Sequence, residues 1–183
     1  MSAVRPHRWT REAYERLGER GVIAPDERVE LIDGDLVDVS PQSSLHATAI
    51  RKTEEALRRG FSRGFDLRVQ LPLALSEIDE PEPDVAVVEG SIDDHRDAHP
   101  TTAVLVVEVA DSSLEFDRTK RAAVYARAGI PGYWIVNLVD DQVEVYRDSD
   151  GELFGWKRTR RAGDSVSPQI QEEPSTAVDD LLP

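Results

Sequence analysis

Two nearly continuous apolar runs constrain the fold of this chain more than any other feature. The first covers residues 84–88 and the second covers residues 103–110. Runs without polar alternation are typical of strands that are buried on both faces, and such strands lie in the middle of a sheet covered by helices. We therefore predict a mixed α/β (α+β) domain in which helices flank a central mixed β-sheet.

Each of these apolar runs carries one acid, Asp84 in the first and Glu108 in the second. An ionised carboxylate is costly to bury unless it is paired or binds a cation. We predict that the two carboxylates and the backbone carbonyl of Val109 meet one ion at the end of the second strand. Hard oxygen donors of this kind favour Mg²⁺, with Mn²⁺ as a substitute.

Lys120 is the candidate basic group beside these acids. A lysine two positions after Glu108 would share its strand face, but that position is Ala110. Lys120 opens the next predicted helix, and we expect it to lean back over the strand end. An ammonium is compact and its pKa shifts readily, unlike that of a guanidinium. The alternative is a surface lysine. Two acids and a lysine together predict metal-assisted phosphodiester hydrolysis.

Periodicity and turn residues place the other elements. Thr10 and Ser43 or Ser44 are candidate helix caps, and Asp33-Gly34 favours a tight hairpin turn. We expect helices at residues 10–20, 44–59 and 117–128, a hairpin at 28–39, and further strands at 65–75, 133–137 and 142–147. From residue 165 the sequence is rich in Pro, Ser and acids, so we predict one domain over 1–164 and a flexible acidic tail over 165–183.

Composition narrows the class of protein. The chain has no cysteine, which excludes disulfides and thiolate metal sites and fits a cytoplasmic protein. We find no apolar segment of membrane-spanning length and no signal peptide. A net charge of -14 argues against non-specific binding to nucleic acid, because phosphate contacts need lysine and arginine side chains. Basic runs at 118–127 and 157–161 are either a basic face or ordinary solvated surface.

The order of the motifs resembles a known family. Pro83-Asp84-Val85, Val107-Glu108-Val109, Asp117-x-x-Lys120-x-x-x-x-Tyr125 and the run at 129–136 resemble the Uma-type restriction endonucleases of the PD-(D/E)XK nuclease superfamily. The resemblance covers about residues 10 to 148. It implies a restriction-endonuclease-like core with an N-terminal helix and hairpin, a metal-dependent site at the ends of the central strands, and DNA as the substrate. One departure places Asp111 where the family carries a Leu-Ser-Pro-Ser-like run.

The resemblance also suggests roles for residues outside the central strands. Glu30, on the hairpin, resembles the extra acid that completes such sites; its alternative is an edge-strand acid in solvent. His46 is a candidate contact to a phosphate or to the attacking water, although a histidine in the first turn of a helix is more often structural. Gln70 and Asp111 are expected beside the site.

The sequence is compatible with three functions. The first is a Mg²⁺-dependent endonuclease acting on DNA through Asp84, Glu108 and Lys120. The second is a catalytically inactive copy of the fold that binds protein or nucleic acid. The third is glycoside hydrolysis by paired carboxylates, which leaves Lys120 without a role. Restriction enzymes of the fold that the chain resembles are commonly homodimers, because cutting two strands needs two sites, but no segment of this sequence indicates an interface. Either the specificity of such an endonuclease is low or a partner protein supplies it.

Overall fold

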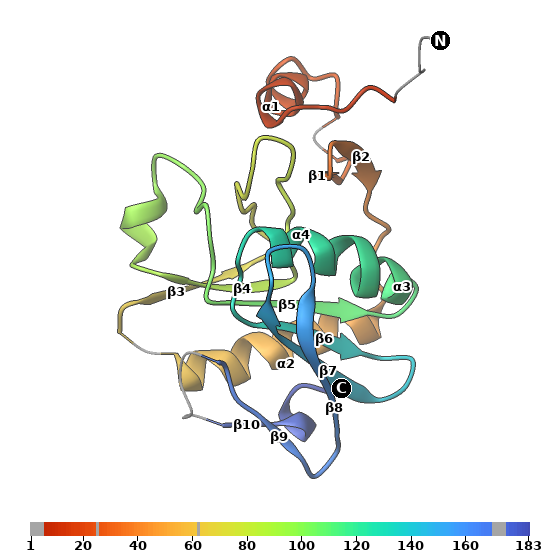
Figure 1. Ribbon diagram of the computed structural model, residues 1–183, viewed down its shortest axis with the longest axis vertical. Coiled ribbons are helices and arrows are strands. Elements are labelled where there is room, and N and C mark those ends of the chain that lie inside the picture. Colours follow the sequence, from red (N-terminus) through yellow and green to blue (C-terminus); the bar gives the residue numbers. More distant parts are fainter. Residues whose placement is uncertain (1–5, 25, 62, 170–174) are drawn as a thin grey trace.

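A six-stranded mixed sheet forms the centre of the protein. The computed structural model describes residues 6–24, 26–61, 63–169 and 175–183 (Figure 1). The strand order is β3-β4-β5-β6-β7-β8, and within this sheet only β5 and β6 pair in parallel. The strands are β3 (Phe65–Val69), β4 (Val85–Glu89), β5 (Leu105–Ala110), β6 (Tyr133–Asn137), β7 (Gln142–Ser149) and β8 (Phe154–Arg161). The predicted mixed sheet is confirmed.

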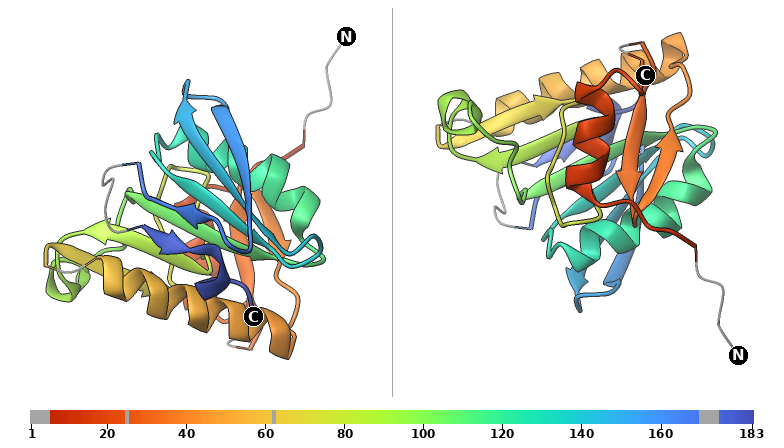
Figure 2. Two further views of the ribbon diagram at one scale, coloured as in Figure 1. Left: turned by 90° about the horizontal axis from the view of Figure 1, so that it is seen from below. Right: turned by 90° about the horizontal axis from the view of Figure 1, so that it is seen from above.

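Helices cover both faces of this sheet (Figure 2). On one face, α2 (Ser44–Gly60) packs Ala49 and Leu57 against Val107 and other side chains of the central strands. On the opposite face, α4 (Ala122–Arg127) packs Tyr125 against Val106 and its neighbours. All six residues of β5 are therefore buried, which explains why its sequence is a continuous apolar run.

The N-terminal part of the chain forms α1 (Arg11–Glu19) and a separate hairpin of β1 (Val29–Ile32) and β2 (Asp35–Asp38). The hairpin turn consists of Asp33 and Gly34, whose φ angles are 52° and 75°. Positive φ at both positions is what a tight primed turn requires. The hairpin joins the body through a bridge between Leu31 and Glu80. The predicted hairpin and its turn residues are confirmed.

The helix after β5 contains a π-helical turn. It runs through α3 (Leu114–Phe116), the π segment η2 (Asp117–Arg121) and then α4. It thus begins three residues before the predicted start. π turns inside helices are rare and often lie at functional sites. A short 3₁₀ helix, η1 (Ile92–His95), precedes β5.

The prediction of a flexible tail from residue 165 is wrong for residues 165–169 and 175–183; residues 170–174 lie outside the described residues. The end of the chain forms β9 (Ser165–Val166), β10 (Thr176–Ala177) and η3 (Val178–Asp180). Val178 and Leu181 are fully buried in the cluster under α2. Lys52 of α2 donates hydrogen bonds to the carbonyls of Asp179 and Leu182. Among the described helices, none has the length and apolar character to cross a membrane.

Candidate active site

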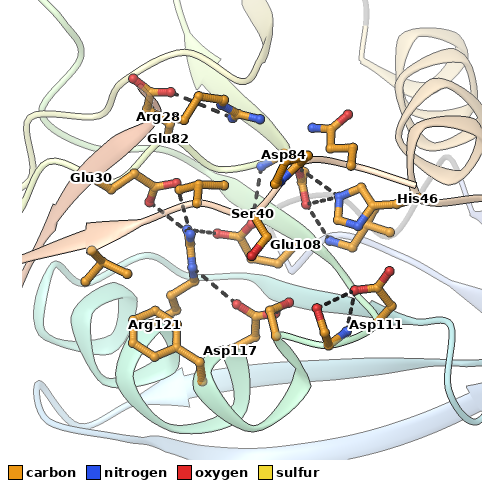
Figure 3. A pocket seen from close by; sticks show the side chains of 18 of the residues that line it. Arg28, Glu30, Ser40, His46, Glu82, Asp84, Glu108, Asp111, Asp117 and Arg121 are labelled. Atoms are coloured by element: carbon orange, nitrogen blue, oxygen red, sulfur yellow. Dashed lines mark hydrogen bonds and ion pairs between the residues drawn. The ribbon is translucent and has the colours of Figure 1, made fainter. Parts of the chain in front are cut away.

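A cavity of about 320 Å³ lies at the end of β5, where four parts of the chain meet (Figure 3). The walls come from the β1–β2 hairpin, the segment that leads into α2, the loop before β4, and the stretch from Val109 to Arg121. The polar and charged residues among its lining are Arg28, Glu30, Asp38, Ser40, Gln42, Ser43, His46, Glu82, Asp84, Glu108, Asp111, Ser112, Ser113, Asp117 and Arg121.

The antiparallel pairing of β4 with β5 brings Asp84 and Glu108 together. Asp84 precedes β4, and the register pairs Val85 with Val107 on β5. The backbone N–H of Asp84 lies 3.3 Å from Oε2 of Glu108, and the N–H of Val109 donates to Oδ2 of Asp84 at 2.9 Å. Asp84 and Glu108 are only 9% and 4% exposed. The structure thus brings these two acids together; that they share an ion with the carbonyl of Val109 stays a prediction.

Lys120 does not join them. Its side chain is 54% exposed, and its ammonium lies 3.9 Å from a carboxylate oxygen of Asp33, on the outer side of the helix. Of the basic residues that line the cavity, the buried one is Arg121. Its Nη1 donates to Oε1 of Glu108 at 2.8 Å. The placement of Lys120 in the site is therefore wrong by one residue: Arg121, which contacts Asp117 and Glu108, lies on the face of the helix that is turned toward the sheet.

Arg121 also holds two acids that lie outside the central strands. Its Nη2 donates to Oε1 of Glu30 at 3.0 Å, and its Nε lies 3.2 Å from Oδ1 of Asp117. Glu30 is 1% exposed, so the alternative of an edge-strand acid facing solvent is wrong. Asp117 also accepts a hydrogen bond from Oγ of Ser113 at 2.6 Å.

Sequence reasoning missed the roles of Asp117, Arg121 and Tyr125 in this cluster. The Tyr125 hydroxyl donates to Oε1 of Glu108 at 2.5 Å, where Arg121 also donates. The three residues are spaced four apart, so they share one face of a helix. This spacing is a signal that could have been used: when an acid and a base share a helix face with an aromatic residue, the charged pair is predicted to face inward with the aromatic ring.

The remaining sequence candidates surround Asp84 and Glu108. His46 Nε2 lies 3.4 Å from Oδ2 of Asp84, and Gln70 Nε2 donates to Oδ1 of Asp84 at 3.2 Å. Asp111 lines the cavity and accepts a hydrogen bond from Oγ of Ser112 at 3.0 Å. His46 and Gln70 thus fix the orientation of the Asp84 carboxylate, and Asp111 adds negative charge at the end of β5.

The site holds more negative charge than its own cation offsets. Four buried acids, Glu30, Asp84, Glu108 and Asp117, face one buried guanidinium, that of Arg121. Burial raises the pKa of Glu108 well above its ordinary value, although Arg121 opposes the shift. Burial likewise raises the pKa of Asp117 to about 6, again against the effect of Arg121. Such a site favours the arrival of a further cation.

The donor set fits a hard divalent cation. The described residues contain no group of three or more His, Cys, Asp or Glu side chains placed to hold a metal ion. Mg²⁺, however, is commonly bound through one or two carboxylates while it keeps several waters, and Asp84 and Glu108 supply two. In addition, Oε2 of Glu30 is buried and accepts no hydrogen bond of good geometry from the described residues; its neighbour is Nη2 of Arg121 at 2.9 Å. A carboxylate oxygen with a lone pair left over is a suitable acceptor for a water bound to such an ion.

Comparison with known proteins places the chain in a family. The Uma2 family, described as "Putative restriction endonuclease", matches residues 11–178. The chain belongs to the Uma2 family. The resemblance seen in its motifs is confirmed, and the description of the family is that of a nuclease. A search of curated proteins finds no match.

The solved structures agree on the fold of this Uma2 protein. A crystal structure from Anabaena variabilis, described as "a putative nuclease belonging to DUF820", matches with a TM-score of 0.74. The two sequences are 14% identical, and the match covers 94% of this chain and 96% of the other. At this identity the match shows the fold alone, and it confirms the predicted architecture of a mixed sheet flanked by helices.

Proposed function

We propose that this protein is a divalent-cation-dependent nuclease that hydrolyses phosphodiester bonds in DNA. The observation that carries the proposal is the convergence of Asp84 and Glu108 in an acidic cavity of a chain that belongs to the Uma2 family. The reaction adds water to phosphorus and breaks one P–O ester bond. A phosphate monoester and a free hydroxyl result; one proton of the water goes to the leaving oxygen and the other to solvent.

In this proposal Asp84, Glu108 and the carbonyl of Val109 hold one Mg²⁺ or Mn²⁺. The ion would polarise the phosphate and lower the pKa of a bound water. The protein supplies the positioning. Arg121 and Tyr125 fix Oε1 of Glu108 and leave Oε2 on the side of Asp84. His46 and Gln70 fix Asp84 in the same way.

Glu30, His46 and Arg121 have further proposed roles. Glu30, whose buried Oε2 accepts no hydrogen bond of good geometry from the described residues, would accept one from a water on the ion. His46 lines the cavity and would contact a phosphate oxygen or the attacking water. Arg121 offsets the charge of the acids when no ion is present, and we propose it as the cation of the site in place of Lys120. Because it contacts Glu108, Glu30 and Asp117, it acts as a positioning residue.

The test is a cleavage assay on labelled DNA with Mg²⁺ or Mn²⁺. Glu108→Gln and Asp84→Asn should each lower the rate by about a hundredfold or more, since each removes charge that positions the cation at the reacting phosphate. Lys120→Ala is the matched control and should cleave like wild type, because its side chain is exposed and outside the cavity. A Glu108→Gln protein as active as wild type would contradict the proposal.

One observation favours the second candidate function, an inactive module that binds protein or nucleic acid. Arg121 already occupies the acids of the site: its guanidinium contacts Glu108, Glu30 and Asp117. The guanidinium therefore supplies part of the positive charge that a metal ion would otherwise bring to these acids. Wild-type protein that neither binds Mn²⁺ nor cleaves DNA would support this second function.

A further inference from the structure

The acids of the candidate site lie inside the cavity and not on an open surface. Glu30, Asp84 and Glu108 are 1%, 9% and 4% exposed, and the cavity around them measures about 320 Å³. Cavities at the lower end of the usual range for ligand pockets, about 300 to 1,000 Å³, surround a small ligand on most sides. A phosphate must therefore enter the cavity to reach Asp84 and Glu108.

The walls of the cavity restrict how a phosphate can enter. Strand β2 and the segment that follows it, which includes Val37 and Pro41, line the cavity together with residues of the stretch from Asp111 to Phe116. In a duplex the phosphates lie on the outside of a stiff double helix, so one phosphodiester cannot move into a cavity without deforming its neighbours. A single strand bends at each nucleotide, so it can present one phosphodiester to the cavity.

The charge of the lining also selects against a duplex. The cavity is lined by seven acids and by only three basic residues. The acids are Glu30, Asp38, Glu82, Asp84, Glu108, Asp111 and Asp117, and the basic residues are Arg28, Arg121 and His46. The chain as a whole carries a net charge of -14. A duplex presents one charge per about 1.7 Å of axis, and a single strand about half that density. A divalent cation offsets the charge of one phosphodiester, whereas the flanking phosphates of a duplex would face the acidic rim, by which we mean the acids of the lining that solvent reaches, such as the exposed Asp38.

An aromatic side chain at the cavity fits a base from an unpaired strand. Phe116 lines the cavity and is partly exposed. Aromatic rings at single-strand sites stack on bases of any sequence, and the faces of those bases are free only when the strand is unstacked.

From these observations, and resting on the nuclease function proposed above, we propose that the substrate is unpaired DNA. A flexible single strand or single-stranded overhang enters the cavity one phosphodiester at a time, and the interior of a continuous duplex does not. This assignment also fits the excess of acids at the cavity, because one phosphodiester with one divalent ion adds little net charge to it.

The experiment compares three labelled substrates of the same sequence in the presence of Mn²⁺: a single strand, its blunt duplex, and a duplex with a single-stranded overhang. Wild-type protein should cleave the single strand at least about tenfold faster than the blunt duplex, in line with the difference in charge density. Cuts in the third substrate should lie in the overhang. Cuts inside the blunt duplex at the rate of the single strand would overturn the proposal.

A binding measurement tests the substrate class independently of the nuclease function. Fluorescence anisotropy with the same substrates and Ca²⁺ measures affinity whether or not DNA is cleaved. If the protein does not cleave but binds the single strand about tenfold more tightly, the substrate class is supported and the nuclease function is contradicted. Equal or weaker binding of the single strand overturns the substrate class even when cleavage is observed.

A charge reversal at the rim tests whether the acids there repel duplex DNA. Asp38 is exposed and lines the cavity, so Asp38→Lys should raise duplex binding severalfold. Glu152→Lys makes the same change in the turn between β7 and β8, at the opposite end of the sheet, and should leave duplex binding unchanged. The same response in both variants would overturn the proposed role of the acidic rim.

Discussion

Replacing Arg121 by methionine removes the one buried cation of the site. Its guanidinium lies 2.8 Å from Glu108 and 2.9 Å from Glu30, and its Nε lies 3.2 Å from Asp117. Methionine has a similar length without the charge. Removing one partner of a buried ion pair typically costs about 3 to 5 kcal/mol, because the remaining charges are left without compensation. We expect Arg121→Met to lower the free energy of unfolding at pH 7 by this amount.

A second calculation gives the same magnitude. Without Arg121, the folded protein lowers its energy by protonating one of the buried acids. A glutamate with an ordinary pKa of about 4.5 that stays protonated in the fold at pH 7 costs about 3.4 kcal/mol, since each pKa unit is worth about 1.36 kcal/mol. The folded variant then binds more protons than the unfolded chain. Its stability must therefore increase as pH falls, by about 1.4 kcal/mol per unit for each extra proton.

Urea unfolding followed by circular dichroism at pH 7 and pH 5 measures both effects. Lys120→Met is the matched control: its side chain is exposed on the same helix, and we expect a change within about 0.5 kcal/mol. An Arg121→Met protein within about 1 kcal/mol of wild type at pH 7 would refute the reasoning. A penalty that grows toward pH 5 would refute it as well.

Three further predictions concern buried polar groups. Burial raises the pKa of Asp117 from 3.8 to about 6, so the cost of ionising it develops between these two pH values and is complete above the second; Asp117→Asn should be more stable than wild type by about 1 to 3 kcal/mol at pH 7.5 and equal to it near pH 4 in urea titrations. Despite burial, hydrogen bonds from Arg118 and Lys157 lower the pKa of Glu144. Its contribution is therefore complete above about pH 4.5 and declines progressively as the pH falls toward the lowered pKa, and Glu144→Gln should cost about 2 kcal/mol at pH 7 and less at pH 3, as thermal unfolding can measure. Lys52→Ala removes the hydrogen bonds to the end of the chain and should speed amide exchange in η3 more than in β5; unchanged exchange there would contradict the role of Lys52.

The central strands were predictable because a strand that is buried on both faces has a continuous apolar sequence. The apolar run of β5, all of it buried, and the Asp33-Gly34 turn with its positive φ angles are local signals. The end of the chain gave no such signal. Val178 and Leu181 stand in a short segment at the end of a Pro-, Ser- and acid-rich stretch, and their burial depends on packing under α2.

The same contrast applies to the site. Asp84 and Glu108 could be predicted because an acid inside an apolar run needs a partner. Arg121 lies four residues after Asp117 and four before the buried Tyr125, so the helical repeat indicates Arg121 as the cation that faces the sheet. The prediction chose Lys120 because the resemblance placed a lysine on this helix, and the composition of the basic run alone does not separate the two.

The central claim is that Asp84 and Glu108 share a divalent cation, and Mn²⁺ binding measured by calorimetry tests it without any choice of substrate. Wild-type protein should bind Mn²⁺, and both Asp84→Asn and Glu108→Gln should weaken binding by about tenfold or more, because each removes a charged oxygen ligand. Absence of binding to wild type up to millimolar Mn²⁺, or unchanged binding by both variants, would contradict the account.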